Sequence, residues 1–203
     1  MNIENFYFYS LLSDNAKKLV QENIKPFQLQ KQGILYYAGD VCEDFVLLDK
    51  GAIRVYVQGE GDETFTLYTV GGGQPCIINT FSTIFSSVTI ANAEVEEEIE
   101  GWMLNKKILL ELLGKEPEYS AYLFSMVSDN IASLVDTIRD IKFLTISERL
   151  EEWVFSQKST SIKVTHEKIA MHLGTSRPVI SKLLKDMENE GKIFLKRGVI
   201  EVL

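Results

Sequence analysis

The segment Thr165–Gly191 constrains the fold of this 203-residue chain more than any other stretch. Its apolar residues recur at helical spacing on both sides of Gly174, so the pattern predicts two short helices joined by a tight turn. Thr165 can cap the first helix, Gly174 can supply the left-handed backbone that ends it, and Pro178 suits the opening turn of the second. The apolar faces of the two helices comprise Ile169, Ala170, Leu173, Ile180, Leu183, Leu184 and Met187.

This spacing is typical of a helix-turn-helix, whose second helix enters the major groove of DNA. Arg177 is the best candidate for direct base recognition, because a guanidinium can form two hydrogen bonds with a guanine edge. Lysines are expected to contact phosphates, whereas serines can contact either a phosphate or a base. An ordinary helical hairpin with a solvated basic face is the alternative. The residues expected to contact DNA are Thr165, His166, Thr175, Ser176, Arg177, Pro178, Ser181, Lys182, Lys185, Lys196 and Arg197.

The segment Val164–Val202, VTHEKIAMHLGTSRPVISKLLKDMENEGKIFLKRGVIEV, resembles the C-terminal winged helix-turn-helix of the Crp/Fnr family of bacterial transcription regulators. Ile193–Leu195 and Val199–Val202 are expected to form the β-hairpin wing, with the turn at Lys196–Gly198 close to a phosphate. The resemblance implies a sequence-specific transcription regulator, with double-stranded DNA and RNA polymerase as partners.

The region from Ile24 to about Met103 has short apolar runs broken by glycines, which predicts an antiparallel roll or sandwich. Within it, KQGILYYAGD (Lys31–Asp40) and FVLLDKGAIRVY (Phe45–Tyr56) resemble the cyclic-nucleotide-binding β-roll of the same family. We therefore expect an α+β fold with an effector-sensing β-roll in residues 1–116, a dimerisation helix and hinge in 117–143 and a winged helix-turn-helix in 144–203. Turn glycines are expected at Gly33, Gly39 and Gly51.

The expected effector region differs from that of relatives that bind cyclic AMP. Those relatives hold the ribose and phosphate with a glutamate and an arginine, but Gly71–Val88 contains neither residue type. Cyclic AMP is therefore not expected as the effector, although backbone N–H groups of Gly71–Gly73 could hold another anion. The residues expected to line an effector pocket are Gly72, Gly73, Cys76, Ile77, Thr80, Phe124 and Val127.

Other sensor chemistries are limited by the few cysteines and histidines. An iron–sulfur cluster of the oxygen-sensing kind needs about four thiolates, and the chain has two cysteines. Both histidines, His166 and His172, lie in the expected DNA-reading module, so a histidine-ligated haem in the roll has no evident ligand. Cys76 can be a haem thiolate or a thiol that senses redox state or nitric oxide, or it can be a small buried hydrophobic residue.

The segment Pro117–Phe143 carries apolar residues at alternating spacings of three and four, which is the heptad pattern of a two-stranded coiled coil. The pattern predicts a homodimer that reads a near-palindromic operator. The run that follows, FLTISERLEEWVFSQKS, resembles the hinge and next helix of the Crp/Fnr family, which implies a hinge at Phe143–Thr145. One long amphipathic helix packed only on its own roll is the alternative. The residues expected at the dimer interface are Phe124, Val127, Ile131, Leu134, Ile138 and Ile141.

The charge distribution supports a nucleic-acid partner although the whole chain carries −8. From Lys158 onward nine Lys and Arg face five Asp and Glu, which gives +4 and leaves −12 for the remainder. No catalytic set or metal-ligand spacing is present, and the acidic run Glu94–Glu100 is expected to be a solvated strand face, so an enzyme is not expected. The sequence predicts a cytoplasmic protein without a membrane span. A module that binds an effector and other proteins, but not DNA, is the alternative from a different class.

Overall fold

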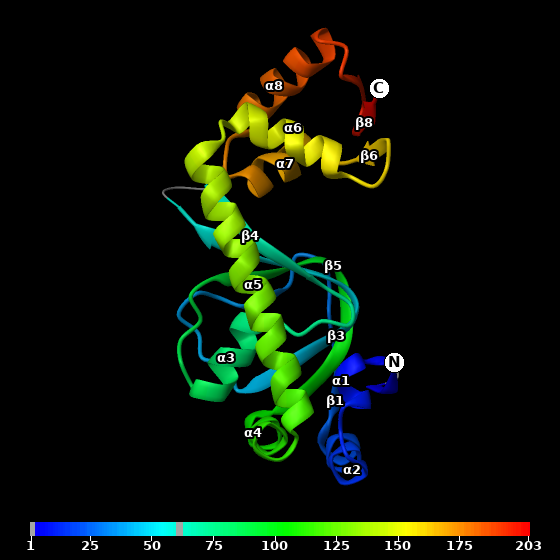
Figure 1. The fold of residues 1–203 in the computed structure, drawn as a ribbon, viewed down its shortest axis with the longest axis vertical. Coiled ribbons are helices and arrows are strands. Elements are labelled where there is room, and N and C mark those ends of the chain that lie inside the picture. Colours follow the sequence, from blue (N-terminus) through cyan, green and yellow to red (C-terminus); the bar gives the residue numbers. More distant parts are fainter. Residues whose placement is uncertain (1–2, 60–62) are drawn as a thin grey trace. The chain divides into compact units, whose positions relative to one another are not determined.

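The computed structural model describes residues 3–59 and 63–203, which fold into two units (Figure 1). The first unit comprises the chain up to Val57 together with Leu67–Ala132, and the second comprises Gln58–Thr66 and Ser133–Leu203. None of the described helices is both long and apolar enough to cross a bilayer. The division into residues 1–116, 117–143 and 144–203 stays a prediction.

The first unit is built on a five-stranded sheet. Its path runs β1 (Lys25–Leu29), β5 (Asn92–Asn105), β3 (Asp44–Gln58) and β4 (Thr64–Gly71), and β2 (Ile34–Tyr36) also pairs with β5. β5 is antiparallel to β1, β2 and β3, so the predicted antiparallel roll is confirmed. The middle of the expected turn between β3 and β4 lies outside the described residues.

The interior of this sheet is filled by its own side chains. Ile53 and Val55 of β3 and Val95 and Ile99 of β5 are buried. The expectation that the acidic run faces solvent holds only in part, because Glu97 and Glu98 are exposed whereas Glu94, Glu96 and Glu100 are half-buried. The remaining buried residues of this cluster are Tyr36, Val46, Leu48, Val70, Cys76, Ala91 and Ala93. The roll therefore has a packed core of its own.

Three local features differ from the sequence analysis. Gly51 lies inside β3 at a register shift, with φ +82°, so it forms a bulge and not a turn between strands. A Cβ at Gly51 would stand 2.2 Å from the carbonyl oxygen of Glu98, which leaves room for glycine alone. The segment Asn92–Asn105 forms the single long strand β5, although its acidic middle separates two apolar runs in the sequence. A helix that was not expected, α3 (Ile77–Phe85), follows the turn after β4.

Short helices cover one end of the sheet in the first unit. They are η1 (Ile3–Asn5), α1 (Tyr7–Ser10), α2 (Asp14–Asn23) and α4 (Lys106–Lys115). Ser13 caps α2, since its hydroxyl accepts the N–H of Ala16 at 3.4 Å. Their apolar faces share a core with Tyr119 and Leu123, so the first turns of α5 are anchored to this unit.

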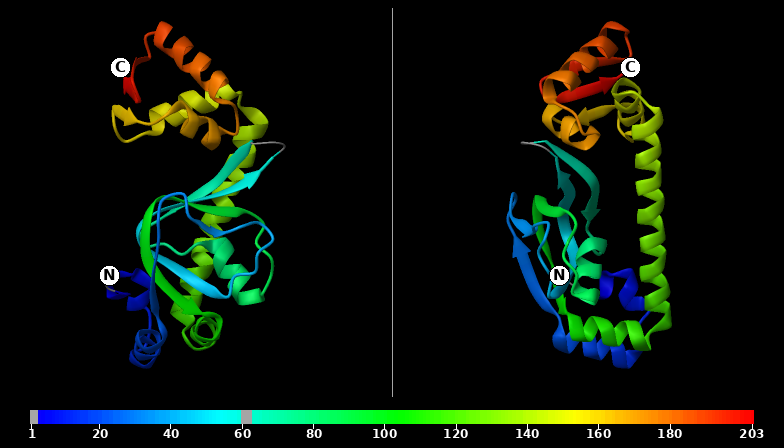
Figure 2. Two further views of the ribbon diagram at one scale, coloured as in Figure 1. Left: turned by 180° about the vertical axis from the view of Figure 1, so that it is seen from behind. Right: turned by 90° about the vertical axis from the view of Figure 1, so that its left-hand side faces the viewer.

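Helix α5 (Pro117–Phe143) has the bounds expected for the dimer helix. Its first half runs alongside α3, which lies between the sheet and α5 (Figure 2). Beyond Leu123 no residue of the helix is buried, and large apolar side chains remain in solvent. The most exposed of the predicted interface residues are Phe124, Ile131, Ile138 and Ile141.

The second unit contains three helices and a three-stranded sheet that follow α5. The helices are α6 (Ile146–Ser156), α7 (His166–Leu173) and α8 (Arg177–Asn189), and the strands are β6 (Ser161–Lys163), β7 (Ile193–Lys196) and β8 (Val199–Val202), in the order β6-β8-β7. The predicted wing is the pair β7 and β8, and β6 is a third strand that the sequence analysis missed.

The core of the second unit joins all three helices to the sheet. Its members are Leu150, Val154, Ile162, Ile169, Ala170, Leu173, Ile180, Leu184, Met187, Ile193 and Ile200. α6 begins at Ile146, where Thr145 caps it and Glu148 completes a capping box. This small unit has a core that is complete without the roll.

Candidate nucleic-acid interface and sensing cavity

The turn between α7 and α8 has the geometry that the sequence predicts. Thr165 caps α7 by accepting the N–H of Lys168 at 3.2 Å, and Gly174 ends it with φ +65°. Ser176 occupies the N-cap position of α8 but makes no side-chain cap bond, and Pro178 lies in the first turn. The Ser176 hydroxyl is therefore not used by the helix and is exposed for a ligand.

Helix α8 separates its apolar face from a polar outer face. Ile180 and Leu184 are completely buried, whereas Arg177, Pro178 and Lys182 are exposed. Thr175 and Ser181 are half-buried at the edges of the same surface, and Lys185 is exposed one turn further on. The structure thus brings the expected DNA-contacting residues of α8 together on one side of the helix.

The cations of this surface fall into two groups. Lys185 lies 2.6 Å from Glu188, and Lys196 of the wing lies 2.6 Å from Glu201. Among the described residues no ion pair holds Arg177, Lys182 or Arg197. These last three cations can meet phosphates or bases without first leaving a carboxylate.

Glu188 connects α8 to the wing. Its side chain accepts the backbone N–H of Leu195 at 2.8 Å while it pairs with Lys185. The hydrogen bond from Lys185 is the main reason why the pKa of Glu188 is lowered, and the Leu195 N–H lowers it further. The wing turn itself, at Arg197 and Gly198, is exposed beyond this anchor.

His166 is joined to Ser181 across the two helices. The Nδ1 atom of His166 lies 2.8 Å from the Ser181 Oγ, and both residues are half-buried. The sequence analysis placed both residues at the DNA surface but gave no signal that they contact each other, since fifteen positions separate them.

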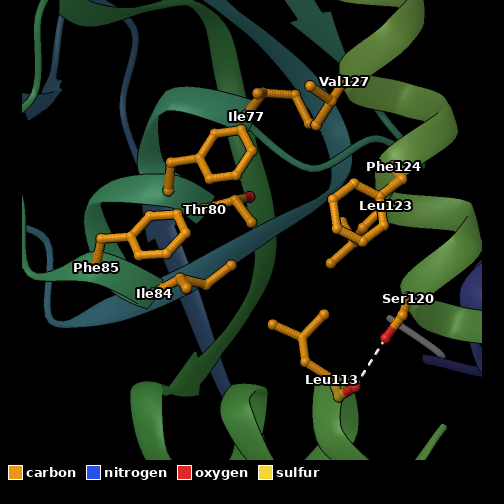
Figure 3. A pocket seen from close by; sticks show the side chains of 10 residues that line it. Ile77, Thr80, Ile84, Phe85, Leu113, Ser120, Leu123, Phe124 and Val127 are labelled. Carbon is orange, nitrogen blue, oxygen red and sulfur yellow. Dashed lines mark hydrogen bonds between the residues drawn. The ribbon is translucent and has the colours of Figure 1, made fainter. Parts of the chain in front are cut away.

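The first unit contains a cavity of about 250 Å³ between α3, α4 and the first half of α5. Figure 3 shows side chains of α3 facing Leu123, Phe124 and Val127 of α5, with Leu113 of α4 below. Four of the expected pocket residues line it, Ile77, Thr80, Phe124 and Val127. Six other lining residues were not predicted: Phe81, Ile84 and Phe85 lie on the unexpected helix α3, and Leu113, Ser120 and Leu123 lie on α4 and α5.

The lining of this cavity is apolar and carries no charged side chain. Its two hydroxyls are already engaged, since Thr80 donates to the carbonyl oxygen of Cys76 and Ser120 to that of Leu113, each at 2.8 Å. Arg54, the only arginine that precedes the cavity residues in sequence, is buried, pairs with Glu94 at 3.2 Å and stacks on the ring of Tyr56. No guanidinium is therefore offered to a phosphate here.

Two of the three glycines at the end of β4 and directly after it already use their N–H groups. Gly71 N–H donates to Gln74 Oε1 at 3.4 Å, and Gly73 N–H donates to the carbonyl oxygen of Leu48 at 2.7 Å. Gly72 and Gly73 are exposed and, like Cys76, do not line the cavity. The residues present do not fit the ribose and phosphate of cyclic AMP.

Cys76 lies inside the roll at 1% exposure. Its Sγ is 3.1 Å from the hydroxyl of Tyr36, and the hydroxyl of Tyr68 accepts the nearby Ile78 N–H at 3.4 Å. Burial raises the pKa of the Cys76 thiol, so the reactive thiolate is disfavoured. This environment supports the small buried hydrophobic residue among the alternatives for Cys76. The described residues contain no cluster of His, Cys, Asp and Glu that could hold a metal ion.

Known proteins resemble this chain both in sequence and in fold. The family model of the Crp-like helix-turn-helix domain matches residues 141–203. A relative, the cAMP-activated global transcriptional regulator Vfr of Pseudomonas aeruginosa, is 23% identical over 80% of this chain and 81% of its own length.

Two solved structures share the fold across nearly the whole chain. A transcriptional regulator of the Crp/Fnr family from Eubacterium rectale has a TM-score of 0.77 at 24% identity, covering 98% of this chain and 94% of its own. The c-di-GMP-responsive global regulator CLP of Xanthomonas campestris has a TM-score of 0.79 at 13% identity, covering 94% and 99%. With the helix-turn-helix geometry of α7 and α8 and the antiparallel roll, these matches support a DNA-binding transcription regulator of the Crp/Fnr type, with a Crp-like helix-turn-helix domain in residues 141–203.

Proposed function

We propose that this regulator acts as a cytoplasmic homodimer that reads a near-palindromic operator through α8 and responds to an uncharged, apolar effector. The observation that carries the DNA-reading part is the first two turns of α8, where Arg177 and Lys182 are exposed and unpaired and the opposite, apolar face is buried. An exposed guanidinium can grip a guanine edge, and a free ammonium can replace phosphate counterions.

The exposed stripe of α5 supports the homodimer. Phe124 is 72% exposed and Ile138 is 65% exposed, and these residues recur with Ile131 at the heptad spacing. Apolar side chains at such positions are stabilised when a second helix covers them, and a second copy of α5 has the matching pattern. Twofold symmetry would present two copies of α8 to successive major grooves.

The cavity beside α5 supports an effector without charge. A cavity in which no side chain is charged and both hydroxyls are engaged favours an apolar ligand over an anion. Because Phe124 and Val127 belong both to the cavity and to the predicted dimer stripe, a bound ligand would change the packing of α5. Such a ligand can favour one arrangement of the two protomers in the dimer. The favoured arrangement would then determine how the dimer contacts RNA polymerase.

The DNA-reading function is tested by selecting binding sites from a random pool of duplexes with the purified protein at two salt concentrations. We expect a near-palindromic sequence whose binding weakens steeply with salt. An Arg177→Ala protein, selected in parallel, should recover a less defined sequence. Enrichment of no sequence by the wild-type protein, with no salt-sensitive background, would favour the alternative of a module that binds only proteins.

The effector class is tested with a neutral probe and its charged counterpart. Naphthalene should raise the thermal unfolding midpoint of the full chain, whereas 1-naphthoate, cyclic AMP and cyclic di-GMP should not. Ile84→Trp and Leu113→Phe fill the cavity from α3 and α4, and each should abolish the naphthalene effect while operator binding is kept. A larger shift with any of the three anions than with naphthalene would contradict the proposed chemistry.

A further inference from the structure

The contact between His166 and Ser181 links the start of α7 to the DNA-facing side of α8. His166 is the first residue of α7, directly after the Thr165 cap, where a helix N-terminus approaches a phosphate. Ser181 precedes the unpaired cation Lys182 in the next turn after Arg177. The 2.8 Å contact therefore connects a position suited to phosphate binding with a position suited to base recognition.

A neutral imidazole has one nitrogen that donates and one that accepts. A phosphate oxygen only accepts, so a phosphate contact requires a proton on Nε2 of His166. In the neutral ring this leaves Nδ1 without a proton, and Nδ1 then accepts the hydroxyl hydrogen of Ser181. Once that hydrogen is used, the Ser181 oxygen can act toward a base only as an acceptor.

We propose that His166 is a positioning residue for base recognition, which makes the Ser181 hydroxyl an acceptor that selects the amino group of adenine or cytosine. In the major groove these bases present N6–H₂ and N4–H₂ donors, whereas guanine and thymine present acceptors at the corresponding edge. Ser176 provides the contrast within the same surface, because its hydroxyl makes no cap bond and remains free to donate or accept. The inference rests on the proposed function, namely that α8 reads an operator.

Two isosteric substitutions separate the two nitrogen atoms of the ring. In His166→Asn the amide oxygen takes the place of Nδ1 and can still accept from Ser181, but nothing reaches the place of Nε2. In His166→Gln the amide reaches the place of Nε2 and can still contact a phosphate, but Ser181 is released. His172→Gln is the matched control, since it makes the same change at the only other histidine, on the same helix.

The experiment measures the affinity of each full-length protein for the selected operator and for all its single base-pair variants. Ser181→Ala identifies the base pair at which discrimination depends on Ser181. We expect His166→Gln to reduce the preference for adenine or cytosine there about three- to tenfold, with other positions unchanged. His166→Asn should keep that preference and lower the affinity for every duplex alike, and His172→Gln should change neither.

The inference is overturned if His166→Asn and His166→Gln change the affinities for the operator variants in the same way. It is also overturned if His166→Gln leaves the Ser181-dependent base preference intact. Misfolding cannot give the expected result, because one variant should lose only the base preference and the other only overall affinity. Failure of the proposed function is distinguishable, since the wild-type protein would then bind no operator.

The tautomer of His166 is checked directly by imidazole ¹⁵N shifts of the His172→Gln protein on its operator at about pH 8, where free imidazole is neutral. Protonated Nε2 with unprotonated Nδ1 is expected, and the opposite tautomer contradicts the inference.

Discussion

The two units differ in what they leave exposed. The second unit buries its apolar residues in one core and presents cations and hydroxyls on α8 and the wing, whereas the first unit leaves Phe85 and Phe124 in solvent around an apolar cavity. The roll is already filled by residues such as Tyr36 and Cys76, so the cavity lies outside it, against α5. The comparison indicates that the second unit presents polar groups to a polar partner, whereas the first unit leaves apolar surface available for apolar contacts.

The difference between the two units is tested most severely by placing charges on the exposed apolar stripe of α5. Ile131→Asp combined with Ile138→Asp should prevent burial of the stripe by a second copy and yield a monomer. Operator affinity should then fall by about two to four orders of magnitude, because the second half-site is no longer held near the first. Sedimentation velocity and operator titration measure both effects.

The control for this charge introduction is Ser125→Asp combined with Ser133→Asp, which adds the same charges on other faces of α5. That variant should remain dimeric and bind the operator. A dimeric Ile131→Asp, Ile138→Asp protein with unchanged affinity would show that the stripe is not the interface.

The base-reading role of Arg177 predicts the next largest effect. Arg177→Ala should weaken binding to the operator by roughly 5- to 150-fold and relax the preference at one base pair in each half-site. Fluorescence anisotropy with the operator and its single base-pair variants measures the change. An equal loss on every duplex would instead assign Arg177 to a phosphate.

The two groups of cations on the reading surface predict a smaller difference. Lys182→Ala should weaken binding to all duplexes and reduce the salt slope by about 1, because Lys182 is free of carboxylates. Lys185→Ala should have less effect, since Lys185 must first leave Glu188 at 2.6 Å. Titrations over a series of salt concentrations compare the slopes, and equal slopes for the two variants would contradict the distinction.

The cap of α6 tests whether the second unit is stabilised independently of DNA binding. Thr145→Ala should lower the free energy of unfolding by about 1 kcal/mol through loss of the N-cap. Hydrogen bonds from the Thr145 backbone and side chain lower the pKa of Glu148 in the folded state, so its stabilisation is present above the ordinary carboxyl pKa and is lost as pH falls through the lowered value.

Chemical denaturation across this pH range, with Glu148→Gln beside wild type, measures the effect. The stability difference should be largest near neutral pH and disappear in acid. Glu152→Gln, on the same helix, is the control for the loss of a carboxylate from α6. A difference that persists below the lowered pKa would contradict the cap assignment.

The smallest expected effect concerns the thiol inside the roll. Cys76→Ala should leave operator binding and its response to oxidants unchanged, because burial raises the pKa of the thiol and keeps reagents away. In a Cys42→Ala protein, iodoacetamide should alkylate Cys76 slowly until denaturant is added. Rapid alkylation of Cys76 in the native protein would instead support its alternative role as a thiol that senses redox state or nitric oxide.

The reading unit could be predicted almost completely from the sequence, because each element has a local signal. Gly174 ends a helix, Thr165 caps one and Pro178 opens the next, and these signals lie within a few residues of the structure that they determine. The exceptions are long-range: pairing of β6 with β8 and of His166 with Ser181 depends on packing between segments that the sequence does not relate.

The first unit was less predictable, because more of its structure depends on packing between distant segments. The antiparallel strands follow from alternation in β3 and β5, but α3 lies in a stretch of Ile, Phe, Ser and Thr whose local preference does not favour a helix. Its N-cap, Cys76, makes no side-chain cap bond that could mark its start. Since α3 supplies half of the cavity lining, the pocket could be predicted only in part.

The central claim, that a homodimer reads DNA with two copies of α8, is tested most directly by a hydroxyl-radical footprint on the selected operator, with the mass of the complex measured in solution. We predict two protomers per duplex and two protected regions about 34–36 Å apart along the DNA, one helical turn. A single protected region bound by one protomer, or uniform protection that ignores the sequence, would contradict the claim.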